Sequence, residues 1–309
     1  MELNDFDLQI QTTASDGKHT PAECVRMAKE NGVRTIAITD HDTVAGVAEA
    51  LAAGEEMGVR VIPGIEISAQ DHGMHLLGLG IDTKDRALRA ALARASESRT
   101  NAAQEMVRRF QEGGFAVDWE DVLREAGEAI ITRPHIVAAI MARSENREKL
   151  AGIATKHDFF EKYFGKESPY YVRGSQITAK QAIALVRGAG GIAVWSHPPL
   201  PDFVGKCNEL EAFLRELIGW GLDGIELFGP ALTDADFACL EKLAASYGLL
   251  RTAGSDFHEA SAVSGKPWPR SASTIGDFPA FGRDLGGIME KLDSAMEERE
   301  KARAAMGAL

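Results

Sequence analysis

The chain has 309 residues, 45% of them hydrophobic and 26% charged, which is enough for a single α/β barrel with a sizeable core. Its net charge of −12 argues against a general electrostatic grip on long duplex nucleic acid, although bound cations and a few arginines can still attract a phosphate group. Its apolar runs are far shorter than a membrane span, and residues 1–5 show no secretory signal. We therefore expect a cytoplasmic protein with no membrane contact.

The three cysteines, Cys24, Cys207 and Cys239, are widely separated in the sequence. An odd number at such spacing favours reduced thiols, which are typical of cytoplasmic proteins. No zinc site built from cysteines can be recognised among them.

Short apolar segments alternate with segments of helical periodicity along most of the chain, which is typical of an α/β fold with a parallel sheet. Seven strands are predicted, at residues 5–11, 34–39, 59–68, 74–81, 191–195, 223–228 and 249–253. Helices are predicted at residues 21–31, 44–57, 179–188, 210–220, 234–247 and 284–306.

The interval between the fourth and fifth predicted strands, residues 82–190, is almost wholly helical in its periodicity. We interpret it as a helical insertion, or cap, over a barrel formed by residues 1–81 and 191–309. Insertions of this kind often determine substrate selectivity. Helices are predicted within it at residues 99–111, 119–126, 134–143 and 156–164. The cap core is expected to contain five aromatic residues, with nucleobase stacking as the alternative role: Phe159, Phe160, Tyr163, Tyr170 and Tyr171.

Polar residues gather where the predicted strands begin or end. In the first strand, apolar and polar residues alternate, so Asp7, Gln9 and Gln11 share one face. The other strands deliver acidic or histidine residues, namely Asp16, His41, Glu66, His75, His197, Asp256 and His258. A single such residue is often structural, but buried unpaired carboxylates are costly, and strand ends converge in a barrel. The pattern therefore indicates a metal cluster with Zn²⁺, Mn²⁺ or Fe²⁺ as the ion.

Seven short motifs follow one another along the chain. They are D-L-Q-I-Q-T-T-A-S-D-G, I-A-I-T-D-H-D-T, P-G-I-E-I-S, H-L-L-G-L-G-I-D, T-R-P-H, W-S-H-P and G-S-D-F-H. Together they resemble the polymerase-and-histidinol-phosphatase (PHP) superfamily, and within it the branch of nucleoside-3′,5′-bisphosphate phosphatases and 5′-3′ exoribonucleases. The resemblance implies a distorted (β/α)7 barrel. It also implies a metal-dependent phosphoesterase that hydrolyses a small phosphomonoester, such as a nucleoside 3′,5′-bisphosphate or a short RNA 5′ end, through a metal-activated hydroxide.

The resemblance further implies a catalytic centre with two or three divalent ions (Mn, Fe or Zn). Glu66 would bridge two of them, with Asp256 at the first ion and with His75 and His197 at the second. Asp16, His41 and His258 would hold the third. The implied catalytic residues are Asp16, His41, Glu66 and Asp256.

The same resemblance assigns the substrate phosphate to Arg133 and His135 of the T-R-P-H motif. A planar guanidinium fork suits a phosphate group well. Arg173 is a candidate for a second phosphate, with a solvated surface arginine as the alternative.

The sequence departs from the family at Gln9 and Gln11, where the family has two histidine ligands. A carboxamide is a poorer ligand than an imidazole, so the first ion would keep only Glu66 and Asp256 as strong ligands. One interpretation is a dinuclear enzyme. Another is a natural or engineered form of lowered or absent activity that still binds a phosphorylated ligand. A histidinol-phosphate-type phosphatase is a further alternative.

Overall fold

The structure is a computed structural model that describes residues 3–164, 168–174, 176–198, 202–230, 232–260 and 272–307. One curled sheet contains seven strands in chain order from β1 to β7. They are β1 (Phe6–Ile10), β2 (Thr35–Ile38), β3 (Arg60–Ser68), β4 (His75–Leu79), β5 (Ile192–Ser196), β6 (Gly224–Phe228) and β7 (Leu250–Ala253). The two ends of the sheet approach each other where Ile10 pairs with Phe257, just after β7. The predicted distorted barrel of seven strands is confirmed.

β4 runs antiparallel to both of its neighbours, while the other pairs of strands are parallel. The prediction of a parallel sheet is therefore wrong at this strand. The reason is the connection at residues 69–74, which is too short for the crossover that a parallel neighbour would require. Because β4 is reversed, its first residue, His75, pairs with Ser68 and Ser196 at the carboxyl ends of β3 and β5.

The helices that belong to the barrel cover the sheet. Thr20 and Glu23 form a capping box at the start of the first helix, and Pro21 occupies its first position. These helices are α1 (Pro21–Glu30), α2 (Val47–Met57), α7 (Ala179–Gly188), α8 (Cys207–Trp220), α9 (Asp234–Tyr247) and α10 (Ile288–Gly307). Within the described residues, every helix is too short or too polar to cross a lipid bilayer.

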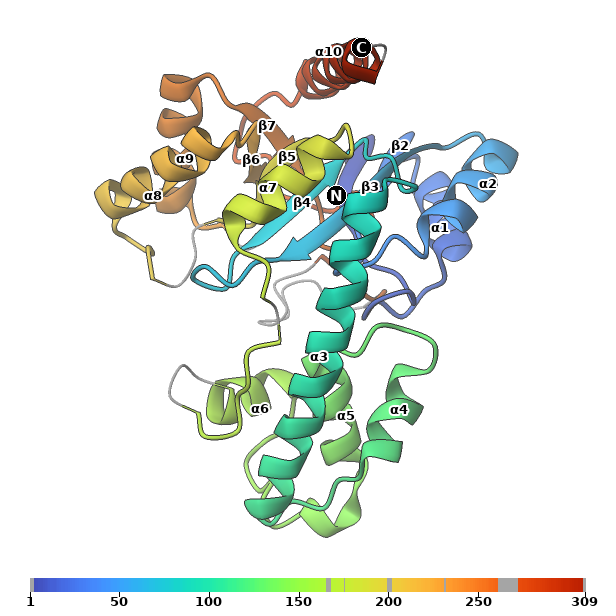
Figure 1. The fold of residues 1–309 in the computed structure, drawn as a ribbon, viewed down its shortest axis with the longest axis vertical. Helices are drawn as coiled ribbons and strands as arrows, with labels where there is room; N and C mark the ends of the chain where they lie inside the picture. Colours follow the sequence, from blue (N-terminus) through green and yellow to red (C-terminus); the bar gives the residue numbers. More distant parts are fainter. Residues whose placement is uncertain are drawn as a thin grey trace.

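The cap lies at one end of the molecule and α10 lies at the other (Figure 1). It contains α3 (Arg86–Glu112), α4 (Trp119–Ala126), α5 (Arg133–Ala142), the short 3₁₀ helix η1 (Ser144–Asn146) and α6 (Lys156–Tyr163). An aromatic core holds these helices together, and in it Phe110 stacks on Tyr170 with ring centroids 4.4 Å apart. All five aromatic residues predicted for the cap core pack in this cluster, so that prediction is confirmed.

Two helices of the predicted insertion pack against the barrel. Leu88 and Leu92, in the first half of α3, belong to the same hydrophobic cluster as the sheet, and so does Ile183 of α7. In the second half of α3, Met106 and Phe110 belong to the cap cluster instead. The division of the chain at residues 82–190 stays a prediction, and this packing favours narrower limits for the cap.

Cys207 and Cys239 form a disulfide, with their Cα atoms 6.1 Å apart. The prediction of reduced thiols is therefore wrong for these two residues. Sequence spacing gave no sign of the pair because the two cysteines are 32 positions apart, one in α8 and the other in α9, and they meet only when these helices fold side by side. Cys24 is buried and free. Reduced thiols no longer support the expected cytoplasmic location, which stays a prediction.

Candidate metal centre

All seven histidine and carboxylate residues predicted as metal ligands gather at one edge of the sheet, where the start of β4 meets the carboxyl ends of the other strands. Three residues at this edge, Asp42, His197 and Asp256, adopt left-handed backbone angles, with φ of 52°, 33° and 49°. Such angles cost about 1–3 kcal/mol each in non-glycine residues and occur most often at functional sites. The chain therefore turns sharply after β2, β5 and β7, where it presents side chains to one centre.

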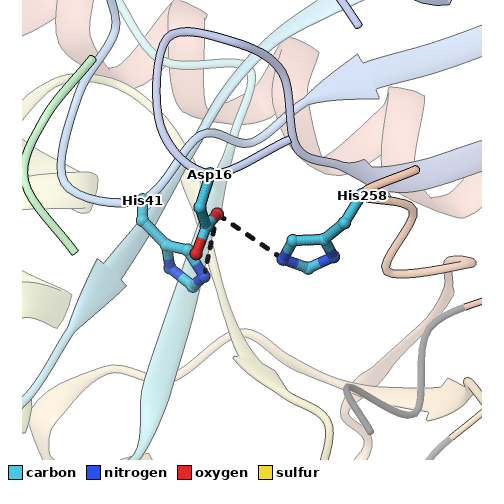
Figure 2. Close-up of side chains that lie close together, drawn as sticks. All are labelled: Asp16, His41 and His258. Carbon is cyan, nitrogen blue, oxygen red and sulfur yellow. Dashed lines mark ion pairs between the residues drawn. The ribbon is translucent and has the colours of Figure 1, made fainter. Parts of the chain in front are cut away.

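Asp16, His41 and His258 form the first candidate metal group (Figure 2). The Asp16 Oδ1 atom lies 3.5 Å from His258 Nε2 and 4.0 Å from His41 Nε2. His258 donates its Nδ1 proton to the carbonyl oxygen of Asp256, 2.8 Å away, so its Nε2 atom presents a lone pair toward Asp16. This is the tautomer that a metal-binding imidazole requires.

The second candidate group, His41, Glu66 and His75, surrounds Glu66, which is fully buried near the carboxyl end of β3. Its Oε1 atom lies 2.9 Å from His75 Nδ1 and 3.1 Å from His197 Nε2. Its Oε2 atom lies 3.7 Å from His41 Nδ1. His41 therefore stands between the two groups, with one ring nitrogen toward each.

The donor atoms of both groups suit divalent metal ions. Within each group of three, the ligand atoms lie within 4.8 Å of one another. Within the described part of the chain, Asp16 Oδ1 and His41 Nδ1 are buried and have no hydrogen-bond partner. Buried polar atoms are rarely left in this state, and a bound cation is one of the standard reasons for it. Nitrogen and carboxylate donors together favour Mn²⁺, Fe²⁺ or Zn²⁺.

The electrostatics of the cluster also fit cation binding. Burial raises the pKa of Glu66, but His41, His197 and His75 outweigh it and hold this pKa well below its usual value. Burial lowers the pKa of His41 to about 4, so its ring is neutral and able to bind a metal at neutral pH. Burial also lowers the pKa of His197, yet the hydrogen bond and charge of Glu66 raise it to about 9. A cation that binds at His197 therefore has to displace a proton.

The side chains of Gln9 and Gln11 face the same cluster and are fully buried. The Nε2 atom of Gln11 donates to Glu66 Oε2 at 2.5 Å, and that of Gln9 donates to the same oxygen at 3.3 Å. Gln9 also donates to Ser196 Oγ at 2.8 Å. Both amides present N–H groups to Glu66, and N–H groups cannot bind a cation. The residues present therefore do not fit the first of the three implied metal positions.

The predicted phosphate contacts differ in their placement. Arg133 and His135 stand at the first turn of α5, in a segment that contacts the barrel where Ile130 N donates to Ala14 O. Ala14 is two residues from Asp16, so this contact brings the segment before α5 to the loop that carries a ligand of the first metal group. Arg173 is exposed between α6 and α7, and its role stays a prediction.

The structure adds three charged residues that the sequence reasoning did not select. Asp40 and Asp42 flank His41; Asp40 binds the loop that carries Asp16, and Asp42 forms an ion pair with Arg99 of α3. Glu226 of β6 accepts the backbone N–H of His197 at 2.7 Å. The sequence contained a sign of all three residues. Asp40 and Asp42 belong to the T-D-H-D motif, and Glu226 is a carboxylate amid aliphatic residues, as Glu66 is.

A curled α/β barrel with two histidine–carboxylate groups at its mouth defines a metal-binding enzyme barrel. Residues 7–173 match the PHP domain, and the chain belongs to this family. The predicted family is thereby confirmed.

Two relatives and one solved structure illustrate the similarity. The chain is 30% identical to a 5′-3′ exoribonuclease of Haemophilus influenzae over 96% of this chain and 98% of the relative. It is 30% identical to a 3′,5′-nucleoside bisphosphate phosphatase of Chromobacterium violaceum over 83% of this chain and 88% of the relative. A crystal structure described as a metal-dependent phosphoesterase of Bifidobacterium adolescentis superposes with a TM-score of 0.76 at 29% identity, covering 94% of this chain and 96% of that one. The prediction of a metal-dependent phosphoesterase is confirmed at this level.

Proposed function

We propose that the protein hydrolyses a phosphomonoester on a small nucleotide, with a nucleoside 3′,5′-bisphosphate or the 5′ end of a short RNA as the substrate. The observation that carries the proposal is the contact between the segment that leads into α5, where Arg133 and His135 stand, and the loop that carries Asp16, through Ile130 N and Ala14 O. Relatives that carry the same domain are named for a bisphosphate phosphatase and for an exoribonuclease. A phosphate held between the cap and the cluster is common to both kinds of substrate.

Arg133 is held in a form that suits phosphate recognition. Its Cζ atom lies 5.7 Å from the ring centroid of Phe160 and 5.6 Å from that of Tyr171. Contact with the two aromatic rings restricts the guanidinium while its N–H groups stay available. A guanidinium group that is exposed but oriented in this way can donate hydrogen bonds to two phosphate oxygens.

His135 would contribute a neutral hydrogen-bond donor. The backbone N–H of Thr132 donates to its Nδ1 atom at 3.2 Å, so in the neutral ring the proton resides on Nε2. Burial lowers the pKa of His135 to about 4, against the opposing effect of the Asp16 charge, so the ring is neutral at physiological pH. Nε2–H can therefore donate to a phosphate oxygen without adding charge.

Divalent ions at the two groups would supply the positive charge that binds phosphate oxygens and the acidity that makes water a nucleophile at neutral pH. The chain supplies the rest of the site. Asp16, His41 and His258 would hold one ion, and Glu66, His75 and His197 would hold another. Arg133 and His135 would orient the phosphate against them.

The test is product release from a panel of substrates after loading with Mn²⁺, Fe²⁺ or Zn²⁺, measured as inorganic phosphate for the monoesters and as inorganic phosphate or nucleoside 5′-monophosphate for the RNA. The panel contains adenosine 3′,5′-bisphosphate, AMP, a 5′-phosphorylated RNA trinucleotide and histidinol phosphate. We expect turnover of the bisphosphate or the RNA, complete loss with a chelator and recovery when metal is restored. Asp16→Asn should lower turnover by about 100-fold or more, because it removes a charged ligand. Asp234→Asn, at an exposed position of α9, is the matched control.

Turnover of none of the panel with any of the three metals would contradict the proposed activity. Faster hydrolysis of AMP or histidinol phosphate than of the other two substrates would contradict the proposed substrate class while leaving a phosphoesterase.

A second candidate function is a binding protein of low turnover, and the amide contacts of Gln9 and Gln11 with Glu66 favour it. Retention of the bisphosphate in equilibrium dialysis without phosphate release would identify this form.

A further inference from the structure

Gln9 lies in β1 and Gln11 directly follows its last residue, and the side chains of both reach the same carboxylate. Their Nε2 atoms both donate to Oε2 of Glu66, at 3.3 Å and 2.5 Å. None of the three side chains reaches solvent, since each has 0% exposure. At this buried position, the amide donors stabilise the negative charge of one carboxylate oxygen.

The two oxygens of Glu66 consequently have different surroundings. Oε2 receives both glutamine amides, whereas Oε1 faces His75 and His197 and accepts the Ser196 hydroxyl at 3.1 Å. Ring nitrogens that can share a cation with Glu66 lie beside both of its oxygens, with His75 and His197 at Oε1 and with His41 Nδ1 at 3.7 Å from Oε2. The side toward β1 is closed by N–H groups, which repel a cation.

We infer that the glutamine pair has replaced the first metal ion of this centre, so that the protein binds two divalent ions and uses two neutral amides where a third ion would lie. This inference rests on the proposed metal-dependent function. It assigns one ion to the Asp16–His41–His258 group and the other to Glu66, His75 and His197, whose facing atoms lie 2.9–3.2 Å apart. It also changes the part played by Glu66, from a bridge between ions to a ligand on one side.

Rotation of the amides does not readily reopen the position. Within the described residues, the Oε1 atoms of Gln9 and Gln11 are buried without a hydrogen-bond partner, as Asp16 Oδ1 and His41 Nδ1 are, so their burial alone does not close the position. For these oxygens to bind a cation, both amides would have to turn, and Glu66 would lose two donors. The resulting ligands would be neutral oxygens, which bind Mn²⁺, Fe²⁺ or Zn²⁺ less well than imidazole does.

The experiment counts ions and does not depend on any substrate. The protein is stripped with a chelator, loaded with excess MnCl₂, freed of unbound metal on a desalting column and analysed by native mass spectrometry and elemental analysis. We expect two ions per chain in the unchanged protein. The double variant Gln9→His with Gln11→His should take up a third ion, and Gln104→His, at an exposed position of α3, should still bind two.

Three ions in the unchanged protein would overturn the inference directly, without any variant that has to fold. A double variant that melts like the unchanged protein but still binds only two ions would also overturn it, because the glutamines would then not be what closes the position. A correct ion count in a protein that hydrolyses nothing would refute the proposed activity and leave this inference standing.

Discussion

Asp40 fixes the loop that carries Asp16. Its Oδ1 atom accepts the backbone N–H of Thr12 at 2.7 Å and the Ser15 hydroxyl at 2.6 Å, and its Oδ2 atom accepts the Thr12 hydroxyl at 2.8 Å. The carboxylate is almost fully buried, at 1% exposure. One side chain at the end of β2 therefore positions a candidate metal ligand that follows β1.

Substitution of Asp40 should produce a graded loss of stability. In Asp40→Asn, the remaining oxygen can keep the contacts of Oδ1, and the Thr12 hydroxyl can turn to accept from the new amide. Asp40→Ala leaves three donors unpaired and should lower the free energy of unfolding by about 1–3 kcal/mol. Urea unfolding of the metal-free protein measures both variants. An alanine variant as stable as the asparagine variant would contradict this role of Asp40.

Residue types and their spacing were enough to predict the histidine and carboxylate cluster. The alternation in Gln9-Ile10-Gln11 placed both amides on the polar face of β1, as observed. Which amide atom faces Glu66 could not be predicted, because it depends on contacts with residues far away in the sequence. The hydrogen bonds that Asp40 accepts from the Asp16 loop were missed for the same reason, because their donors lie 25–28 residues earlier in the chain.

At the level of elements, the strands were predicted to within one or two residues because each is a short apolar run. The direction of β4 was not, because an apolar run looks the same in either direction. His75 was still selected correctly as a neighbour of Glu66, although it is the first residue of its strand and not the last. The short connection at residues 69–74 was the available sign of the reversal.

Asp223, the residue before β6, connects the C-terminal helix α10 to the sheet. Its Oδ1 atom accepts from Arg299 of α10 at 2.7 Å and from Arg187 of α7 at 2.6 Å. Its Oδ2 atom accepts the backbone N–H of Ala193 in β5 at 2.9 Å. A single carboxylate thus joins two helices and a strand.

Asp223→Ala should lower the free energy of unfolding by about 1–3 kcal/mol, since it leaves two guanidinium groups and one amide without their acceptor. Arg299→Ala should cost less, because Arg187 and Ala193 keep their contacts. Glu216→Ala, at an exposed position of α8, is the control and should stay within about 0.5 kcal/mol of the unchanged protein. Urea unfolding gives all three values, and an Asp223→Ala loss within the control range would contradict this role.

For the molecule as a whole, the disulfide between Cys207 and Cys239 predicts a simple count. When the protein is unfolded in guanidinium without reductant, a thiol reagent should detect one free thiol per chain, that of Cys24. After reduction, it should detect three. Three thiols before reduction would show that the α8–α9 bond does not form in the isolated protein.

The 27-residue helix α3 belongs to both cores of the molecule and is about 40 Å long (Figure 1). It contains no proline or glycine that would let it bend, and near its middle Arg99 is tied to Asp42 and to Ser68 Oγ at the barrel edge. A straight helix that packs in both cores keeps the cap from moving relative to the barrel. With ions bound at the two candidate groups, α3 would keep the cap and its Arg133 at a fixed distance from them, and the enzyme would select substrates by the distance between their phosphates.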